Sequence, residues 1–401
     1  MSSQLRSYIL LRILVIIPTL IIISLVIFFL SQHVPQDPAS TVTRMRVGDE
    51  PLNQELIYDE VYRDLSMHLP NFYFSITPRH YPATLNSISN KDTRKKVKEL
   101  LQSGIPYSKI VVDGEKIKSS YSGGGNNILF PKFHWNGFSN KYHTWIKSFF
   151  SGSMGYSLID NQPVSTRIGK AFLWTITLGF IGIAFAYPVA ILIGMRLARN
   201  SKSRSNKLIN QFLYLLYSIP FFWIATMMVI YFTTDTYGSW MNIFPSVGVQ
   251  IYPGKSTLYQ IIGNAKNFIL PVFCLSIPAI TYIATFVKRG IINEMSQPYI
   301  TLAATKGLTQ KQILRKHAFP NALLPLITIF AESIASVLGG TLLIEVIFNI
   351  PGIGRLLFDS IGTADWNIVF SIVLVVALIT TLSYLLGDIL YALANPKIRF
   401  A

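Results

Sequence analysis

The chain has 401 residues, of which 51% are hydrophobic and only 13% are charged, and its formal net charge is +16. A soluble globular domain carries about twice that share of charged residues. The composition therefore excludes a soluble globular protein and indicates an all-α polytopic membrane protein. Much of the positive charge lies in short loops beside apolar segments, so we expect contact with a lipid bilayer and no nucleic-acid partner.

The first apolar segment, Tyr8 to Leu30, is long enough to cross a bilayer, which takes about 20 residues. A signal peptide is the alternative, because Arg6 and Arg12 give the segment a basic start. No small-residue cleavage site follows, so we expect an uncleaved span within residues 1–39. Residues 40–141 are different in kind, since they are polar and contain a glycine break at 123–125. Weak helical periodicity at 52–69 predicts a helix there, and 110–112 predicts a short strand.

Five further apolar segments predict membrane spans at about 172–197, 208–232, 268–287, 321–347 and 367–393. Six spans place both chain ends on one side. The short loops after the second and fourth spans are rich in Lys and Arg, so the positive-inside rule predicts cytoplasmic N- and C-termini. Pro220 and Trp223 lie within the third span. A proline there predicts a kink, which serves either a moving gate or packing alone.

The stretch from Tyr299 to Pro320 is basic and amphipathic, and it connects the fourth and fifth spans. It predicts a helix–turn–helix in which Gly307 ends the first helix with a positive φ. Thr309 is placed to cap a second helix from Gln310 to Ala318. Pro320 cannot continue that helix without a kink.

Ionised groups at mid-membrane cost roughly 2.5–3.5 kcal/mol, which draws attention to Glu332 and Glu345. Glu345 precedes a turn that contains Pro351, Gly352, Gly354 and Arg355. This group is either an outer gate or a binding-protein contact, or Glu345 and Arg355 form a structural pair that holds the turn. Glu332 lies deeper, where it either faces the transport pathway or pairs with a basic residue of a partner subunit.

The stretch at 299–320 resembles the cytoplasmic coupling loop of type I ABC importer permeases. That loop usually reads Glu-Ala-Ala, three residues, Gly, and then Leu-Pro nearer its end. Here Thr301 and Leu302 replace Glu and the first Ala, while Phe319-Pro320 replaces Leu-Pro. The Glu is commonly absent in the peptide-permease branch. By this resemblance the residues that contact an ATPase are Thr301, Leu302, Ala303, Ala304, Gly307, His317, Phe319 and Pro320.

Other segments are similar to the oligopeptide and dipeptide permease B-subunit family. They are Val34–Pro38, which follows the first span, Trp145–Ser157, Ser218–Trp223, Glu345–Arg355 and the ending Asn395–Arg399. The resemblance implies the six-helix type I ABC importer fold, with a large extracytoplasmic insertion after the first helix. The expected parts are an insertion at 40–141, an outer-surface amphipathic segment at 142–165, a permease core at 166–394 and a cytoplasmic tail at 395–401. The insertion is either a small folded cap or a dock for a substrate-binding protein.

The function implied by the resemblance is the transmembrane permease subunit of an ATP-driven, binding-protein-dependent peptide importer in the cell membrane. The implied partners are a homologous second permease subunit, two cytoplasmic ABC ATPase subunits and an extracytoplasmic substrate-binding protein. The sequence has no Walker A loop, so we expect no enzyme activity in the chain itself. We also expect no directly bound cofactor or metal, with ATP and magnesium held by the ATPase subunits.

Other functions remain as alternatives. The cargo is a dipeptide or a nickel chelate instead of an oligopeptide, or the chain is a passive channel or an ion-coupled carrier. A carrier should show inverted repeats and buried ionisable pairs, and neither is convincing here. An intramembrane hydrolase is disfavoured, because the sequence lacks the motifs of such enzymes.

Overall fold

The structure is a computed structural model that describes residues 3–33, 37–47, 51–77, 91–102, 111–112, 115–116, 132–200 and 203–394. Helices dominate these residues, in agreement with the predicted fold class. The described chain divides into two compact units, one of residues 1–23, 166–364 and 372–401 and one of residues 24–165 and 365–371. The predicted glycine break at 123–125, the tail at 395–401, and parts of the 34–38 signature and the 110–112 strand lie outside the described residues.

Among the described residues, four helical segments are long and apolar enough to cross a membrane by themselves. They are Leu10–Gln32 within α1 (Ser3–Gln32), α6 (Val164–Arg199), Ala265–Met295, which joins η3 (Ala265–Phe268) to α10 (Ile269–Met295), and α17 (Trp366–Ala394). Two bent helix pairs are also long and apolar enough, namely Arg204–Ser218 with Phe221–Phe232 and Gln310–Ala322 with Leu324–Val337. The total reaches the predicted six when each pair counts as one span.

The third predicted span, 208–232, is two helices and not one kinked helix. α7 (Arg204–Ser218) and α8 (Phe221–Phe232) meet at 90°. Ile219 and Pro220, between them, have extended backbone angles, with ψ of 128° and 126°. A proline pushes the residue before it out of the helical region and favours the start of a new helix, which is why the chain turns fully here.

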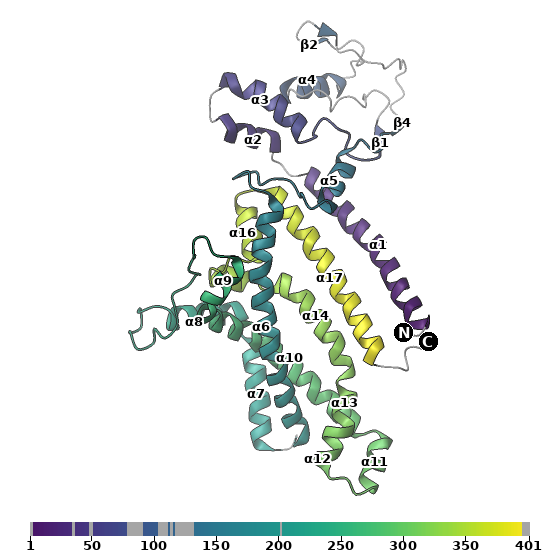
Figure 1. The fold of residues 1–401 in the computed structure, drawn as a ribbon, viewed down its shortest axis with the longest axis vertical. Helices are drawn as coiled ribbons and strands as arrows, with labels where there is room; N and C mark the ends of the chain where they lie inside the picture. The colour runs from purple at the N-terminus through teal and green to yellow at the C-terminus, as the bar shows by residue number, and fades with distance from the viewer. Residues whose placement is uncertain are drawn as a thin grey trace. The chain divides into compact units, whose positions relative to one another are not determined.

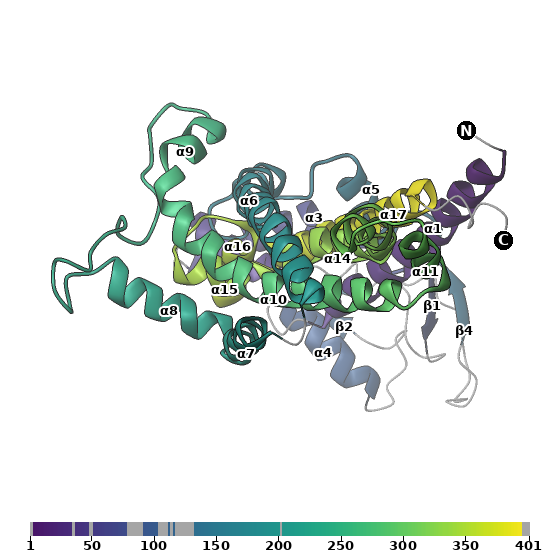
Figure 2. The same cartoon turned by 90° about the horizontal axis from the view of Figure 1, so that it is seen from below.

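Glycines allow close packing between helices of the first unit, whose ribbons are drawn in Figures 1 and 2. A side chain at Gly194 of α6 would come within 2.8 Å of the Ala284 carbonyl oxygen of α10. A side chain at Gly387 of α17 would overlap the Ala331 methyl group of α14 (Leu324–Gly340). Close backbone approach at small residues is typical of helix packing in membranes. The remaining helices of this unit are α9 (Thr257–Gly263), α11 (Pro298–Thr305), α12 (Gln310–Ile313), α13 (Phe319–Ala322), α15 (Leu342–Ile347) and α16 (Ile353–Gly362).

An ion pair joins α1 to α17 within the first unit. Nη1 of Arg12 lies 3.2 Å from Oδ2 of Asp388. The pair neutralises two charges on helices that are otherwise strongly apolar, which lowers their cost in a bilayer. Asp388, near the end of α17, is therefore paired with Arg12 near the start of α1.

The second unit holds the polar segment that follows the first membrane helix. Its helices are α2 (Pro38–Val47), α3 (Pro51–Asp64), α4 (Lys91–Gln102) and α5 (Lys141–Phe150). Its strands are β1 (Phe74–Thr77), β2 (Val111–Val112), β3 (Glu115–Lys116) and β4 (Lys132–Trp135). β1 pairs antiparallel with β4, with Phe74 opposite Trp135, and β2 pairs antiparallel with β3. The helix predicted at 52–69 is present as α3.

Within this unit, a chain of aromatic contacts joins the last turns of α1 to α5 and the segment before β1. The Tyr142 ring of α5 lies 5.3 Å from the Phe28 ring of α1 and 5.3 Å from the Phe72 ring. The Tyr142 hydroxyl is also 2.8 Å from the Ser24 hydroxyl. Phe72 continues the contacts to Phe74, at 5.2 Å. The segment that leads into β1 is thus packed onto α5 and the last turns of α1.

Candidate coupling hairpin and transport cavity

A helical hairpin connects α10 to α14, and its turn is formed by the residues that the sequence indicated. α11 ends at Thr305, and Gly307 has a φ of +80°. Thr309 caps α12: its hydroxyl accepts from the Gln312 backbone N–H, and the Gln312 side chain accepts in return from the Thr309 N–H. A glycine turn followed by a reciprocal capping box fixes the direction of the second helix.

The second helix of the hairpin extends further than the predicted end at Ala318. Residues Leu314–Ala318 form one π-helical turn, and α13 then starts at Phe319. The helix bends by 50° between residues 310–322 and 324–337. A π turn shifts the hydrogen-bond register, so the missing N–H of Pro320 does not end the helix, and the expected kink is spread over the turn and the bend.

One face of the hairpin packs on α10, and the other face is exposed. Ala303 and Ile313 are buried in the same core cluster as Ile283 and Ile291 of α10. Leu302 is 59% exposed, although it is a large apolar side chain. Of the other predicted loop residues, His317 and Phe319 are partly buried, and Thr301, Ala304, Gly307 and Pro320 are exposed. The hairpin is therefore buried on one side and offers an apolar side chain on the other.

The Tyr299 phenol ties the base of the hairpin together. Its hydroxyl donates to Oε2 of Glu294, at the end of α10, over 2.5 Å. The amide of Asn321 in α13 donates to the same hydroxyl over 3.0 Å. Partial burial and, secondarily, the Glu294 carboxylate raise the pKa of the Tyr299 phenol. Because the usual value is already about 10, the hydroxyl remains a donor at neutral pH.

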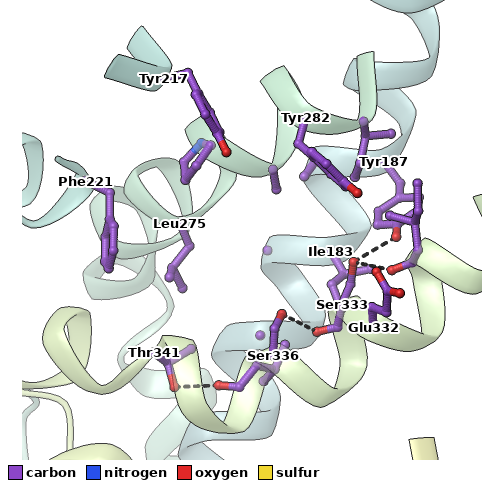
Figure 3. A pocket seen from close by; sticks show the side chains of 18 residues that line it. Ile183, Tyr187, Tyr217, Phe221, Leu275, Tyr282, Glu332, Ser333, Ser336 and Thr341 are labelled. Atoms are coloured by element: carbon purple, nitrogen blue, oxygen red, sulfur yellow. Dashed lines mark hydrogen bonds between the residues drawn. The ribbon is translucent and has the colours of Figure 1, made fainter. Parts of the chain in front are cut away.

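A cavity of about 430 Å³ lies between α6, α7, α8, α10 and α14 (Figure 3). Tyrosines Tyr187, Tyr217 and Tyr282 line it, together with apolar side chains. Among the 18 described residues of its lining, Glu332 is the only one with a charged side chain. A cavity of this size, mostly apolar with a few polar groups, has the character of a small-ligand site.

Several polar groups of the cavity offer lone pairs and no free hydrogen. The Ser333 hydroxyl donates to the Ile329 carbonyl at 2.8 Å, so the Tyr187 hydroxyl, 2.9 Å from it, is the donor of that pair. The Ser336 hydroxyl donates to the Ser333 carbonyl at 2.9 Å. The oxygens of Tyr187 and Ser336 are thereby left as acceptors, as is the Glu332 carboxylate. Within the described part of the chain, no hydrogen bond or ion pair reaches that carboxylate.

The Glu345 carboxylate is fully buried and holds the turn that follows it. Its Oε1 accepts from the hydroxyls of Thr175 at 2.7 Å and Thr341 at 2.8 Å. Its Oε2 accepts from the Arg355 backbone N–H at 3.1 Å. The predicted link between Glu345 and Arg355 is therefore made by the backbone, since the Arg355 guanidinium instead lies 3.6 Å from the Asp359 carboxylate.

Two glycines let the turn approach the carboxylate. A Cβ atom at Gly352 would overlap the Glu345 carboxyl group, and one at Gly354 would lie 3.0 Å from its Oε2. Pro351 precedes this pair in the short link between α15 and α16. Thr341 also lines the cavity, so one side chain contacts both the cavity and the Glu345 carboxylate that holds the turn.

The predicted pathway residues do not all meet at one place. Glu332 lines the cavity, whereas Glu345 is enclosed beside it. Pro220 forms the corner between α7 and α8, and Trp223 is 50% exposed outside the cavity lining. Tyr187, Tyr217 and Tyr282 were not predicted from the sequence, where the available signal was that each is a tyrosine in or beside a predicted span.

The chain is similar in sequence to known transport proteins. The model of the family described as "Binding-protein-dependent transport system inner membrane component" matches residues 190–400. Dipeptide transport system permease protein DppB of Lactococcus lactis subsp. cremoris (strain MG1363) is 31% identical over 65% of this chain and 80% of its own length. Oligopeptide transport system permease protein OppB of Haemophilus influenzae is 31% identical over 67% of this chain and 83% of its own length. Oligopeptide transport system permease protein AppB of Bacillus subtilis is 28% identical over 65% of this chain and 80% of its own length.

Proposed function

The chain belongs to the family of binding-protein-dependent transport system inner membrane components, and we propose that it is the permease subunit of an ATP-driven peptide importer. The peptide cargo is supported by the names of several similar proteins, which are dipeptide and oligopeptide permeases. The chain contributes half of the translocation pathway, and a homologous second permease subunit contributes the other half.

The observation that carries this proposal is the hairpin of α11 and α12. Its Ala303 and Ile313 side chains are buried in one core cluster with Ile283 and Ile291 of α10, and its Leu302 side chain is exposed. It is fastened to α10 and α13 by the Tyr299 phenol. A rigid element with an exposed apolar side chain suits contact with a cytoplasmic ATPase subunit, because a force applied there is passed to α10 and α14.

The same reasoning gives the orientation in the cell membrane. Lys306, Lys311 and Arg315 lie on the hairpin, and by the positive-inside rule this end of the permease faces the cytoplasm. Both chain ends are then cytoplasmic. α16 lies at the end of the first unit opposite the hairpin, so it faces outward, toward an extracytoplasmic substrate-binding protein (Figure 1). ATP and magnesium are held by the two ATPase subunits.

In this mechanism, ATP binding closes the two ATPase subunits and moves the hairpin. The bent helix pair at 310–337 follows the hairpin as a rigid lever, and the cavity between α6, α10 and α14 opens to the other side. ATP hydrolysis then resets the arrangement. The membrane subunit supplies the passage and the lever, and its partners supply the chemistry.

The test is a Gly307→Arg variant of the complete importer in proteoliposomes, with a radiolabelled tripeptide as cargo. Gly307 has open space around it, so the cost of Arg there is limited to backbone strain at its φ of +80°, and the variant should assemble but hydrolyse ATP without peptide uptake. Gly254→Arg is the matched control, because this glycine also has a positive φ, +73°, and open space, but lies outside the hairpin. Normal coupled uptake by Gly307→Arg would contradict the proposal, as would uptake by the permease subunits without the ATPases.

A further inference from the structure

Glu332 presents its carboxyl group to a cavity in a membrane helix bundle, and none of the residues that the structure describes forms a hydrogen bond or ion pair with it. It lies on α14, and Figure 3 shows it at the same end of the cavity as Tyr187 and Tyr282. An ionisable group in such a place is costly to insert and therefore usually functional. Since no described residue supplies a cation, the group that balances this charge comes from outside the chain.

The surrounding groups select the kind of cation. The Tyr187 oxygen has given its hydrogen to Ser333, and the Ser336 oxygen has given its hydrogen to the Ser333 carbonyl. Both oxygens accept further hydrogen bonds, as does the carboxylate. The Tyr282 ring adds an aromatic face, to which cations are attracted. A primary ammonium has three N–H donors and no acceptor, which complements this set.

From this geometry we infer that Glu332, with Tyr187 and Ser336, forms a transient binding site for the primary ammonium group of a passing substrate. This inference rests on the proposed function for its cargo. In a peptide, the ammonium is either the N-terminus or a lysine side chain, and the site accepts the chemistry that both share. The cavity volume of about 430 Å³ leaves room for the residue attached to the ammonium.

The first experiment compares cargoes in the reconstituted importer. Uptake of trialanine, N-acetyl-trialanine and N-acetyl-lysyl-alanyl-alanine is measured for the wild type, Glu332→Gln and Glu332→Asp. Removing the carboxylate should lower uptake of trialanine roughly tenfold at limiting concentration and leave N-acetyl-trialanine unchanged. Glu332→Asp should retain most of the preference. If Glu332→Gln lowers uptake of the acetylated lysyl peptide alone, the site binds the lysine side chain. If it lowers uptake of both peptides that carry an ammonium, the site accepts an ammonium from either the N-terminus or the side chain.

Two results of this experiment would overturn the inference. One is unchanged uptake of every peptide by Glu332→Gln. The other is an equal loss for all three peptides together with loss of the second permease subunit on purification, which would show that Glu332 pairs with that subunit.

A second experiment does not depend on peptide transport, so it separates this inference from the proposed function. Ser336→Cys is introduced with Cys274→Ala, which removes the buried natural thiol. The complex is then labelled with aminoethyl methanethiosulfonate, an ammonium reagent, or with its sulfonate analogue. The ammonium reagent should react faster, and Glu332→Gln should remove that advantage. Equal rates with Glu332 present would overturn the inference even if peptides are transported.

Discussion

The Thr175 hydroxyl of α6 donates a hydrogen bond of 2.7 Å to the buried Glu345 carboxylate of α15, across 170 positions of the chain. The Thr175 oxygen also accepts from the Ile353 backbone N–H at 2.8 Å. One hydroxyl thus links a membrane helix to both ends of the turn that contains Pro351 and Gly352. The acid at this place holds the turn, because its carboxylate accepts from the hydroxyls of Thr175 and Thr341 and from the Arg355 backbone N–H.

Replacing Glu345 by Gln should destabilise the permease by about 1–3 kcal/mol, because the new amide cannot accept from both the hydroxyls and the Arg355 N–H. Thermal unfolding of the purified complex measures the change. Arg355→Gln is the control and should change stability by less than about 1 kcal/mol, since its guanidinium only meets the half-exposed Asp359. A larger loss of stability in Arg355→Gln would support the ion pair between the Glu345 and Arg355 side chains that the sequence suggested.

Gly352→Ala should be more harmful than an alanine at most other glycines of this unit. The added methyl group would overlap the Glu345 carboxyl group, which is enclosed and cannot move away. Overpacking of this kind typically costs about 1–3 kcal/mol. Gly362→Ala, at the end of α16, meets no atom within 4 Å and serves as the control. Equal thermal stability of the two variants would show that the turn yields without cost.

Local chemistry was enough to predict the hairpin of α11 and α12. A glycine with positive φ and a threonine cap act within a few residues, and Gly307 and Thr309 have these roles in the structure. The membrane helices were likewise predictable, because hydropathy over about 20 residues reports what a bilayer accepts. The first and last residues of these helices were less predictable, since α6 begins at Val164 and not near Phe172.

The break at Pro220 and the cavity could not be read from the sequence. A proline in an apolar segment is compatible with a kink or with a full corner, and the neighbouring packing of α8 on α10 decides between them. The acceptor groups around Glu332 come from α6 and α14, and each hydrogen bond depends on how those helices meet. Sequence spacing carries no such information between distant segments.

The ion pair between Arg12 and Asp388 should tolerate an exchange of its two charged residues. Asp388→Arg alone places two cations side by side on apolar helices, so little folded protein should accumulate in the membrane. The double change of Arg12→Asp with Asp388→Arg should recover most of it, because neighbouring residues are coupled. Size-exclusion chromatography of a fluorescent fusion gives the folded amount. Failure of the double variant, with both single variants tolerated, would show that the pair has no role in folding.

Tyr299→Phe should weaken the connection between the hairpin and its membrane helices. The change removes the hydrogen bonds to Glu294 and Asn321 and keeps the ring. Because the phenol is partly exposed, the loss should be only about 1 kcal/mol, too little to prevent assembly. We expect more ATP hydrolysed per peptide imported, measured in proteoliposomes. Tyr259→Phe, on an exposed tyrosine of α9, is the control, and an unchanged ratio for Tyr299→Phe would show that the phenol transmits nothing.

Substitutions at Tyr142 should test whether the segment after α1 is a folded cap. Tyr142→Phe loses only the Ser24 contact, at a cost of about 1 kcal/mol, whereas Tyr142→Ala empties a buried aromatic site and should cost about 3–5 kcal/mol. The second change would expose the segment to added protease in membrane vesicles. Phe138→Ala is the control, because that ring is 71% exposed. If Tyr142→Ala and Phe138→Ala were cleaved alike, at the slow rate of the wild type, the aromatic contacts with Phe28 and Phe72 would not hold the segment in place, and its order would have to come from a bound partner.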